Sequence, residues 1–138
     1  MKRTLSVLVF AAAAFAQDPA YQTVATAAQI MQAIEKPSMD SLVAMKKAGG
    51  PKDENEWKLA KRQAAMIAES AQLLLMGGRP LDQDVWVKSS HALRAAAIDA
   101  AKAAESQDFK AWDASLTAMS SGCRSCHTVH RKKPAARQ

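Results

Sequence analysis

The chain has few of the residues that strands and catalytic sites require. Aromatic residues make up 5% of its 138 residues, β-branched residues are few and alanine is abundant. No alternating strand pattern and no internal repeat are present, and neither a Gly-rich phosphate loop nor a Ser-His-Asp arrangement occurs. The composition therefore predicts an all-α protein, and the missing constellations predict that it is not an enzyme.

Cysteine is equally scarce, with two residues in the whole chain, and both belong to one short motif. Cys123 and Cys126 are followed directly by His127, which makes the pattern C-x-x-C-H. This is the attachment signature of a c-type haem. Two thiols one helical turn apart can add to the two vinyl groups of one porphyrin, and the next residue can bind the iron through its imidazole. The motif predicts one covalent haem c, with His127 as an iron ligand.

Other uses of a C-x-x-C pair fit less well. A structural zinc site needs four ligands, and only His91 and His130 remain in the chain. A thioredoxin-like redox pair belongs in a βαβ context, and a disulfide across one helical turn has poor geometry. The redox pair is kept as the alternative to haem attachment.

The N-terminus predicts export. Lys2 and Arg3 precede a short apolar stretch at residues 5–14, and Ala14 and Ala16 form an A-x-A cleavage site. We expect residues 1–16 to be a cleaved signal peptide and residues 17–138 to be a single haem-binding domain. A retained membrane anchor is the alternative, although the apolar stretch is short for a span. We expect a periplasmic protein whose mature form does not span the membrane, since haem is attached outside the bacterial cytoplasm.

Acidic residues are outnumbered, with 13 Asp and Glu against 19 Lys and Arg, a net charge of +6. We interpret the basic C-terminal end as a solvated helix terminus, with steering toward an acidic redox partner as the functional alternative. Nucleic acid is not an expected partner, because basic and aromatic residues do not interleave. The basic residues of this end are Arg124, Arg131, Lys132, Lys133 and Arg137.

Glycine and proline occur five times each and mark the connections. Breaks at residues 48–51, 77–80 and 106–108 leave four helical segments, expected at residues 20–47, 54–76, 83–104 and 108–132. Asp108 is the expected N-cap of the last segment. Pro37 predicts a kink, or a break at Lys36 with Ser38 or Asp40 starting the second half. Short connections predict an antiparallel up-down-up-down four-helix bundle.

Apolar and small residues recur at steps of three and four in the last three segments, which is the seam period of bundled helices. The tryptophans are expected core anchors, and Met119 is expected to be core packing. The predicted stripes are Trp57, Ala60, Ala64, Ile67, Ala71 and Leu74; Trp86, Ser90, Leu93, Ala97, Ala100 and Ala104; and Phe109, Trp112, Leu116, Met119 and Cys123.

A C-terminal C-x-x-C-H on the last of four helices, followed four residues later by basic Arg131, resembles the class II cytochromes c. These are cytochrome c-prime and its low-spin relatives. The resemblance implies that Cys123 and Cys126 are the thioether positions, that His127 is the proximal ligand and that Arg131 lies near the proximal face. It also implies a homodimer formed through the first two helices. The chain departs from the family at His130, where an aromatic residue is common.

The same resemblance assigns the distal side of the iron to the first helix. Met31, about three turns into the first expected segment, is the expected axial ligand, because a thioether favours ferrous iron. Met39 and Met45, an open distal position, and His91 are the alternatives. Ala27 stands where many members carry Arg. His130 is expected to be partly exposed.

Two main functions follow from these assignments. With His127 and Met31 both bound, the protein is expected to be a one-electron carrier. The alternative is a five-coordinate, cytochrome c-prime-like binder of nitric oxide or carbon monoxide. A haem subunit of a larger membrane-bound complex is a third possibility.

Overall fold

The computed structural model describes residues 22–131, and every regular element in that range is a helix. The all-α fold class is thereby confirmed. The predicted signal peptide, residues 1–16, lies outside the described residues. The elements are α1 (Ala27–Ile30), the π-helical turn η1 (Met31–Glu35), α2 (Lys36–Lys47), α3 (Glu54–Leu73), α4 (Val85–Glu105) and α5 (Phe109–His130).

The first helical segment begins later than residue 20, because its N-cap is Thr26. The Thr26 hydroxyl accepts a hydrogen bond from the Gln29 N–H at 3.2 Å, and the Gln29 side-chain oxygen accepts one from the Thr26 N–H at 2.9 Å. This reciprocal capping box satisfies two backbone donors that would otherwise lack partners.

Pro37 leaves the first segment helical but changes its winding. The π-helical turn η1 directly precedes α2, which begins at Lys36 with Pro37 in its first turn. A wider turn accommodates the proline ring and its missing N–H. The winding changes at Lys36, where a break was one of the two predictions, but the helical segment continues through this residue without a break. The predicted starting role of Ser38 or Asp40 is wrong. Ser38 is buried, and Asp40 pairs with Lys36.

Aspartate side chains cap the N-termini of α3 and α5. Asp53 accepts from the Glu56 N–H at 2.9 Å at the start of α3, and Asp108 accepts from the Ala111 N–H at 3.0 Å at the start of α5. The Asp108 cap is as predicted. The helix ends differ by a few residues from the predicted ones, notably α3, which ends at Leu73.

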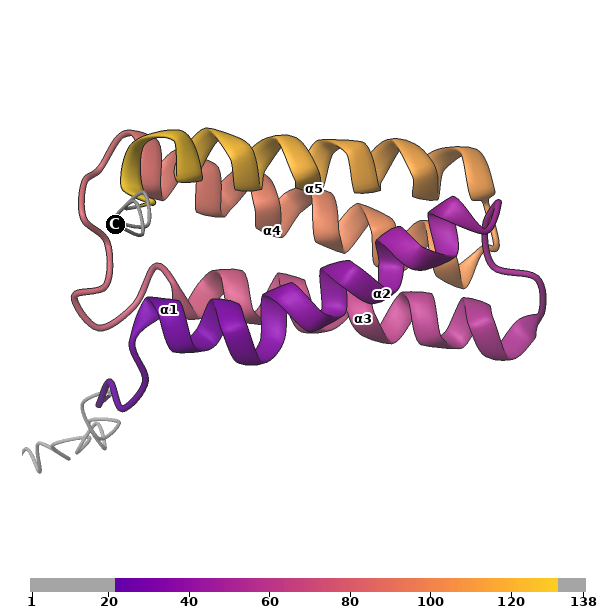
Figure 1. The fold of residues 1–138 in the computed structure, drawn as a ribbon, viewed down its shortest axis with the longest axis horizontal. Coiled ribbons are helices and arrows are strands. Elements are labelled where there is room, and N and C mark those ends of the chain that lie inside the picture. The colour runs from indigo at the N-terminus through magenta and orange to yellow at the C-terminus, as the bar shows by residue number, and fades with distance from the viewer. Residues whose placement is uncertain (1–21, 132–138) are drawn as a thin grey trace, which may run out of the picture.

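α4 lies between α3 and α5 and packs against both, while η1 and α2 pack on α3. Figure 1 shows the end of α5, the start of α1 and the α3–α4 connection at the same end of the molecule. The main core contains Leu42, Ile67, Trp112, Leu116 and Met119, each at most 1% exposed, among many buried alanines.

The predicted stripes are buried with three exceptions. Trp57 and Cys123 are partly buried, and Phe109 is 45% exposed. Phe109 lies over Gly50 instead of facing the core: a Cβ on Gly50 would be only 2.5 Å from its ring. None of the helices within residues 22–131 has both the length and the apolar character needed to cross a membrane.

Candidate functional site

A cleft lies where α5 ends, and it brings together residues that are distant in the sequence. It is nearly filled, with a volume of about 20 Å³. Met31 of η1 lines this cleft together with the C-x-x-C-H residues of α5. The lining residues are Met31, Glu35, Leu74, Ser89, Ser90, Leu93, Gly122, Cys123, Cys126 and His127.

The two cysteines are free thiols on the cleft wall, Cys126 buried and Cys123 partly buried. Burial, together with the smaller effect of the nearby Glu35 carboxylate, raises the pKa of Cys123 to about 11. Burial also raises the pKa of Cys126. Redox-active C-x-x-C pairs have lowered thiol pKa values. The electrostatics of this pair therefore argue against the thioredoxin-like alternative.

His127 presents a neutral imidazole to the cleft. Burial lowers the pKa of His127, and the positive charge of Arg131 lowers it further. Arg131 is exposed one turn later, and its backbone N–H donates to the His127 carbonyl at 3.3 Å. A neutral imidazole is the form that binds iron.

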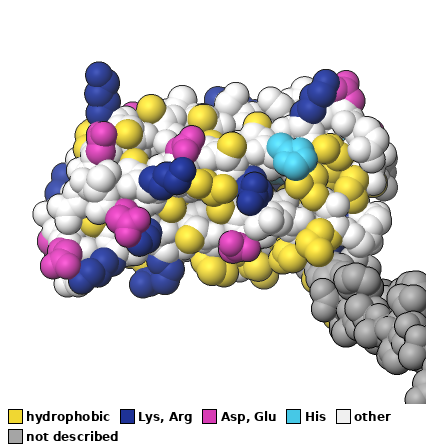
Figure 2. All heavy atoms as spheres, turned by 180° about the vertical axis from the view of Figure 1, so that it is seen from behind, with side chains coloured by type: hydrophobic (Ala, Val, Ile, Leu, Met, Phe, Trp, Pro, Cys, Tyr) yellow, Lys and Arg dark blue, Asp and Glu magenta, His cyan; other side chains and the backbone are white. Residues whose placement is uncertain are grey.

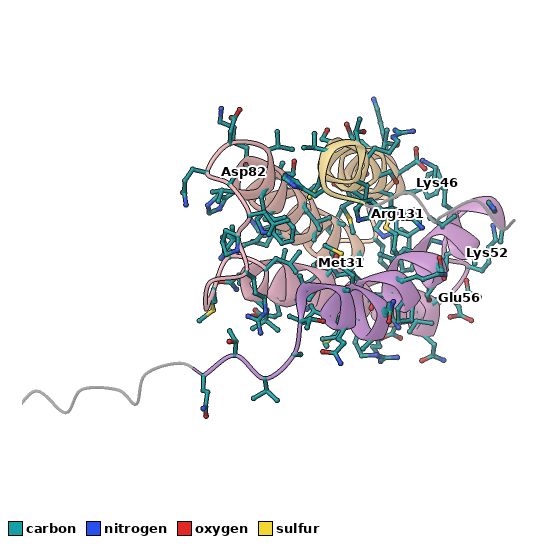
Figure 3. All side chains as sticks on the ribbon, turned by 60° about the vertical axis from the view of Figure 1, so that its left-hand side comes forward. Met31, Lys46, Lys52, Glu56, Asp82 and Arg131 are labelled. Atoms are coloured by element: carbon teal, nitrogen blue, oxygen red, sulfur yellow. The ribbon has the colours of Figure 1, made fainter. Side chains whose placement is uncertain are left out.

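Met31 is the methionine of the first segment that reaches the cleft. It is partly buried and packs beside Ile30, Leu74 and Trp86, and Figure 3 shows it between the first segment and the α4–α5 pair. Met39 and Met45 pack against the main core instead. Because the helix begins at Ala27, Met31 lies about one turn from its start, and the predicted depth of three turns is wrong.

Sequence reasoning missed Glu35, which lines the same cleft four residues after Met31. Its carboxylate is the acceptor of a long hydrogen bond from the Ser70 hydroxyl, at 3.4 Å. Burial raises the pKa of Glu35 to about 7, and the Ser70 hydrogen bond opposes this shift only in part. The i, i+4 spacing from Met31 was the available signal, because it places both residues on one helix face.

His130 lies outside the cleft lining and connects α5 to the α3–α4 connection. Its Nε2 is 2.7 Å from Asp82 Oδ2, and its side chain is 13% exposed. Its ring contacts that of Trp86, with centroids 5.5 Å apart. The hydrogen bond from the Trp86 N–H lowers the pKa of Asp82, which keeps this carboxylate ionised. His130 is thus partly exposed, as predicted, and it helps to hold the turn that carries His127.

The remaining histidine, His91, is exposed on α4, as its position off the seam predicted. It borders a shallow groove together with Gln72, Leu75, Met76 and Arg94. It does not line the cleft that holds Met31 and His127.

The surface around the cleft is unusually apolar. Val24, Leu81 and Val129 are 91%, 67% and 60% exposed. They belong to the start of the first segment, the α3–α4 connection and the end of α5, which meet at this end of the molecule. Figure 2 shows, from behind, apolar side chains gathered toward this end, with charged side chains spread over the whole face.

Within residues 22–131, no three His, Cys, Asp or Glu side chains come together as a metal-binding group. A haem iron needs fewer protein ligands than such a group provides, because the porphyrin nitrogens occupy four of its positions. Comparison with protein-family models, curated proteins and solved structures found no match to the chain.

Proposed function

We propose that the protein is an exported c-type cytochrome of the class II kind that carries single electrons in the periplasm. One haem c would be bonded to Cys123 and Cys126, with His127 and Met31 as the axial ligands. The observation that carries this proposal is that Met31 lines the same cleft as the C-x-x-C-H motif, although the two are far apart in the sequence.

The chemistry of the donor set fits a covalently held haem. Two thiols, a neutral imidazole and a thioether lie on walls that also contain the apolar side chains of Leu74 and Leu93. When bound, the haem supplies one-electron redox chemistry at its iron. His127 and Met31 would supply two protein ligands to it, and apolar walls that exclude water would help to keep its surroundings nearly constant between oxidation states.

The packing of the helices gives the porphyrin a route into the cleft. Its volume of about 20 Å³ is far below the roughly 300–1,000 Å³ of ligand pockets, so η1 must move away from α5 to admit a porphyrin. Both α1 and η1 pack on α3 and make no comparable contact with α5. This arrangement supports an antiparallel up-down-up-down four-helix bundle whose first segment can shift outward.

The protein's partners follow from the same proposal. Arg124 and Arg131 are exposed on α5 beside the cleft, where their charge would steer an acidic redox partner toward the haem edge. The resemblance to class II cytochromes c adds a homodimer, and the signal-peptide pattern adds export. A gel-filtration experiment on the mature protein checks the dimer directly.

The alternative function is a five-coordinate binder of nitric oxide or carbon monoxide. The packing of Met31 against the apolar cluster around Ile30, Leu74 and Trp86 favours it, because methionine on an apolar helix face is often a packing residue. In that case the iron would have His127 as its only protein ligand, and small gases would bind on the Met31 side.

Absorption spectra of the mature protein, produced in a bacterium with a cytochrome c maturation system, test the proposal. We expect a covalent haem by mass spectrometry and, in the ferric state, the weak charge-transfer band of methionine ligation near the red end. Met31→Ala should abolish this band, whereas the control Met45→Ala should keep it. A high-spin wild-type protein that readily binds carbon monoxide would establish the gas-binding alternative. A polypeptide without covalent haem would overturn both.

A further inference from the structure

Arg79 joins the start of the first helical segment to the end of α3. Its Nε and Nη2 donate to the Ala25 carbonyl at 3.1 and 2.9 Å. Its Nη1 donates to the carbonyls of Leu73 at 2.8 Å and Met76 at 3.3 Å. One guanidinium thus satisfies carbonyls at the end of α3, where a positive charge is favoured, and also holds a second segment of the chain.

The contact with Ala25 is continuous with the helix that carries Met31. Ala25 directly precedes the N-cap Thr26, whose carbonyl accepts a hydrogen bond from the Ile30 N–H at 3.1 Å. Met31 follows Ile30. A displacement of Ala25 therefore moves the first turn of the helix and Met31 together.

Few other contacts hold this part of the chain. α1 has only four residues, and α1 and η1 pack on α3 rather than on α5. Ile30, with 4% of its surface exposed, supplies the main apolar anchor in the cluster with Leu74 and Trp86. The position of Met31 along and around the helix axis consequently depends on the two hydrogen bonds from Arg79 to the Ala25 carbonyl.

We propose that Arg79 is a positioning residue that holds the first helical segment so that the Met31 thioether faces the iron. This inference rests on the proposed function, because it requires Met31 to be an axial ligand. A lysine at this position would keep a positive charge at the end of α3, but its single ammonium would lack the planar fork that bridges two segments. The bridging geometry, rather than the charge, is what the proposal requires.

Spectra and carbon monoxide binding of the mature haem protein test the role of Arg79. We expect Arg79→Gln to weaken the ferric methionine band and to raise the carbon monoxide affinity of the ferrous form about tenfold, as the loss of the two Ala25 hydrogen bonds predicts. Arg79→Lys should behave in nearly the same way. Arg62→Gln, which removes an exposed arginine from α3, is the matched control and should resemble the wild type.

Two further measurements separate positioning from general destabilisation. In a Met31→Ala background, Arg79→Gln should change neither the spectrum nor carbon monoxide binding, because the positioned ligand is already absent. Hydrogen exchange of the amides of residues 29–34 should be faster in Arg79→Gln and unchanged in Arg62→Gln. If Arg79→Gln does not fold, Arg79→Lys provides the same comparisons.

The outcomes distinguish this inference from the proposed function. A wild-type protein without the methionine band would overturn Met31 ligation, and with it the carrier proposal. A wild-type band that persists in Arg79→Gln, with unchanged carbon monoxide affinity, would overturn only the role of Arg79. Full recovery by Arg79→Lys would also overturn it, because a charge at the end of α3 would then be sufficient.

Discussion

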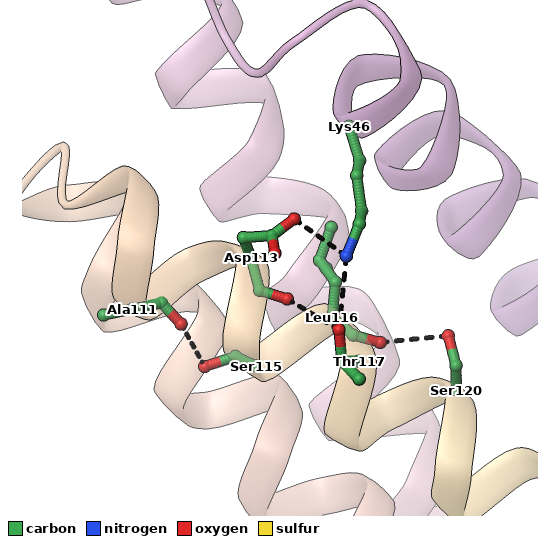
Figure 4. A network of polar contacts seen from close by, with 7 residues as sticks. All are labelled: Lys46, Ala111, Asp113, Ser115, Leu116, Thr117 and Ser120. Carbon is green, nitrogen blue, oxygen red and sulfur yellow. Dashed lines mark hydrogen bonds and ion pairs between the residues drawn. The ribbon is translucent and has the colours of Figure 1, made fainter.

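The two ends of this helical protein are built differently, although the same helices run through both. At the end containing the α2–α3 and α4–α5 connections, the first segment reaches α5 directly. Lys46 Nζ of α2 lies 2.8 Å from Asp113 Oδ1 and donates to the Thr117 hydroxyl at 3.2 Å, as Figure 4 shows. The Trp57 and Trp112 rings pack edge to face beneath this contact, with centroids 6.0 Å apart.

At the other end the first segment and α5 separate around the cleft. Among residues 22–131, the apolar cluster there has four buried members, Ile30, Leu74, Trp86 and Cys126. Polar groups lie close by: Ser89 and Ser90 are buried, and Glu35 is partly buried. The difference shows how one bundle can join its first segment directly to α5 at one end and keep the two apart at the other, where a large ligand would have to displace that segment. It also makes the two ends respond differently to substitution.

The largest expected effect comes from making a cavity at the closed end, the end that contains the α2–α3 and α4–α5 connections. Leu116, 1% exposed, packs in the main core, whereas Leu81, 67% exposed, lies at the cleft end. Leu116→Ala should lower the free energy of unfolding by about 3 kcal/mol, and Leu81→Ala by about 0.5 kcal/mol or less. Urea denaturation of the two variants measures both values. Equal losses of unfolding free energy would contradict the division into a closed end and a cleft end.

The next effect concerns Glu35, the partly buried carboxyl group at the cleft end. Its pKa of about 7 in the folded protein, against 4.5 as its ordinary value, means that the folded state binds the proton more tightly than the unfolded state between these pH values. Stability from this group is therefore fully present below about pH 4.5 and is lost as the pH rises through 7, by at most about 3 kcal/mol. Glu35→Gln should remove this loss.

Denaturation of wild type and Glu35→Gln from pH 5 to pH 8 checks the sign. The variant should gain stability over the wild type as the pH rises. Glu69→Gln, on an exposed position of α3, should follow the wild-type curve. A wild-type protein that becomes more stable than Glu35→Gln at pH 8 would mean that the carboxylate has an ionic partner there.

A smaller effect on the melting temperature is expected from replacing one glycine at each end by alanine. Gly50, at the closed end, and Gly78, at the cleft end, have φ angles of 96° and 74°. Alanine at either position costs about 1 kcal/mol in backbone strain, but only at Gly50 would its Cβ meet the Phe109 ring. Gly50→Ala should lower the melting temperature more than Gly78→Ala, and adding Phe109→Ala should recover part of the difference. Equal melting temperatures would show that the ring moves freely.

The smallest effect is the ion pair that joins α2 to α5. The side chains of Lys46 and Asp113 are 37% and 36% exposed, so Lys46→Ala should cost only about 0.5 kcal/mol and less in high salt. Lys58→Ala breaks the more exposed pair with Glu54 within α3 and should cost still less. A loss at Lys46 that is independent of salt would indicate packing of its aliphatic stem instead of the ion pair.

The sequence by itself determined the features that depend on neighbours along the chain. The helix stripes, the Asp108 cap and the C-x-x-C-H motif all involve residues within a few positions of one another, so helical periodicity and residue chemistry were enough to predict them. The sequence also located the irregularity near Pro37 for this reason, since a proline acts on its own helical turn. It did not specify that the irregularity would be a π-helical turn instead of a kink or a break.

The tertiary structure alone decided which distant residues share the cleft. The placement of Glu35 beside Cys123, the contact of His130 with Asp82, and the bridge from Arg79 to Ala25 each join different segments. Their partners are chosen by the relative height and rotation of packed helices, which helical periodicity does not specify. The sequence could nominate Met31 among several methionines, but only the packing of the first segment on α3 brought it to the wall of the cleft that His127 also lines.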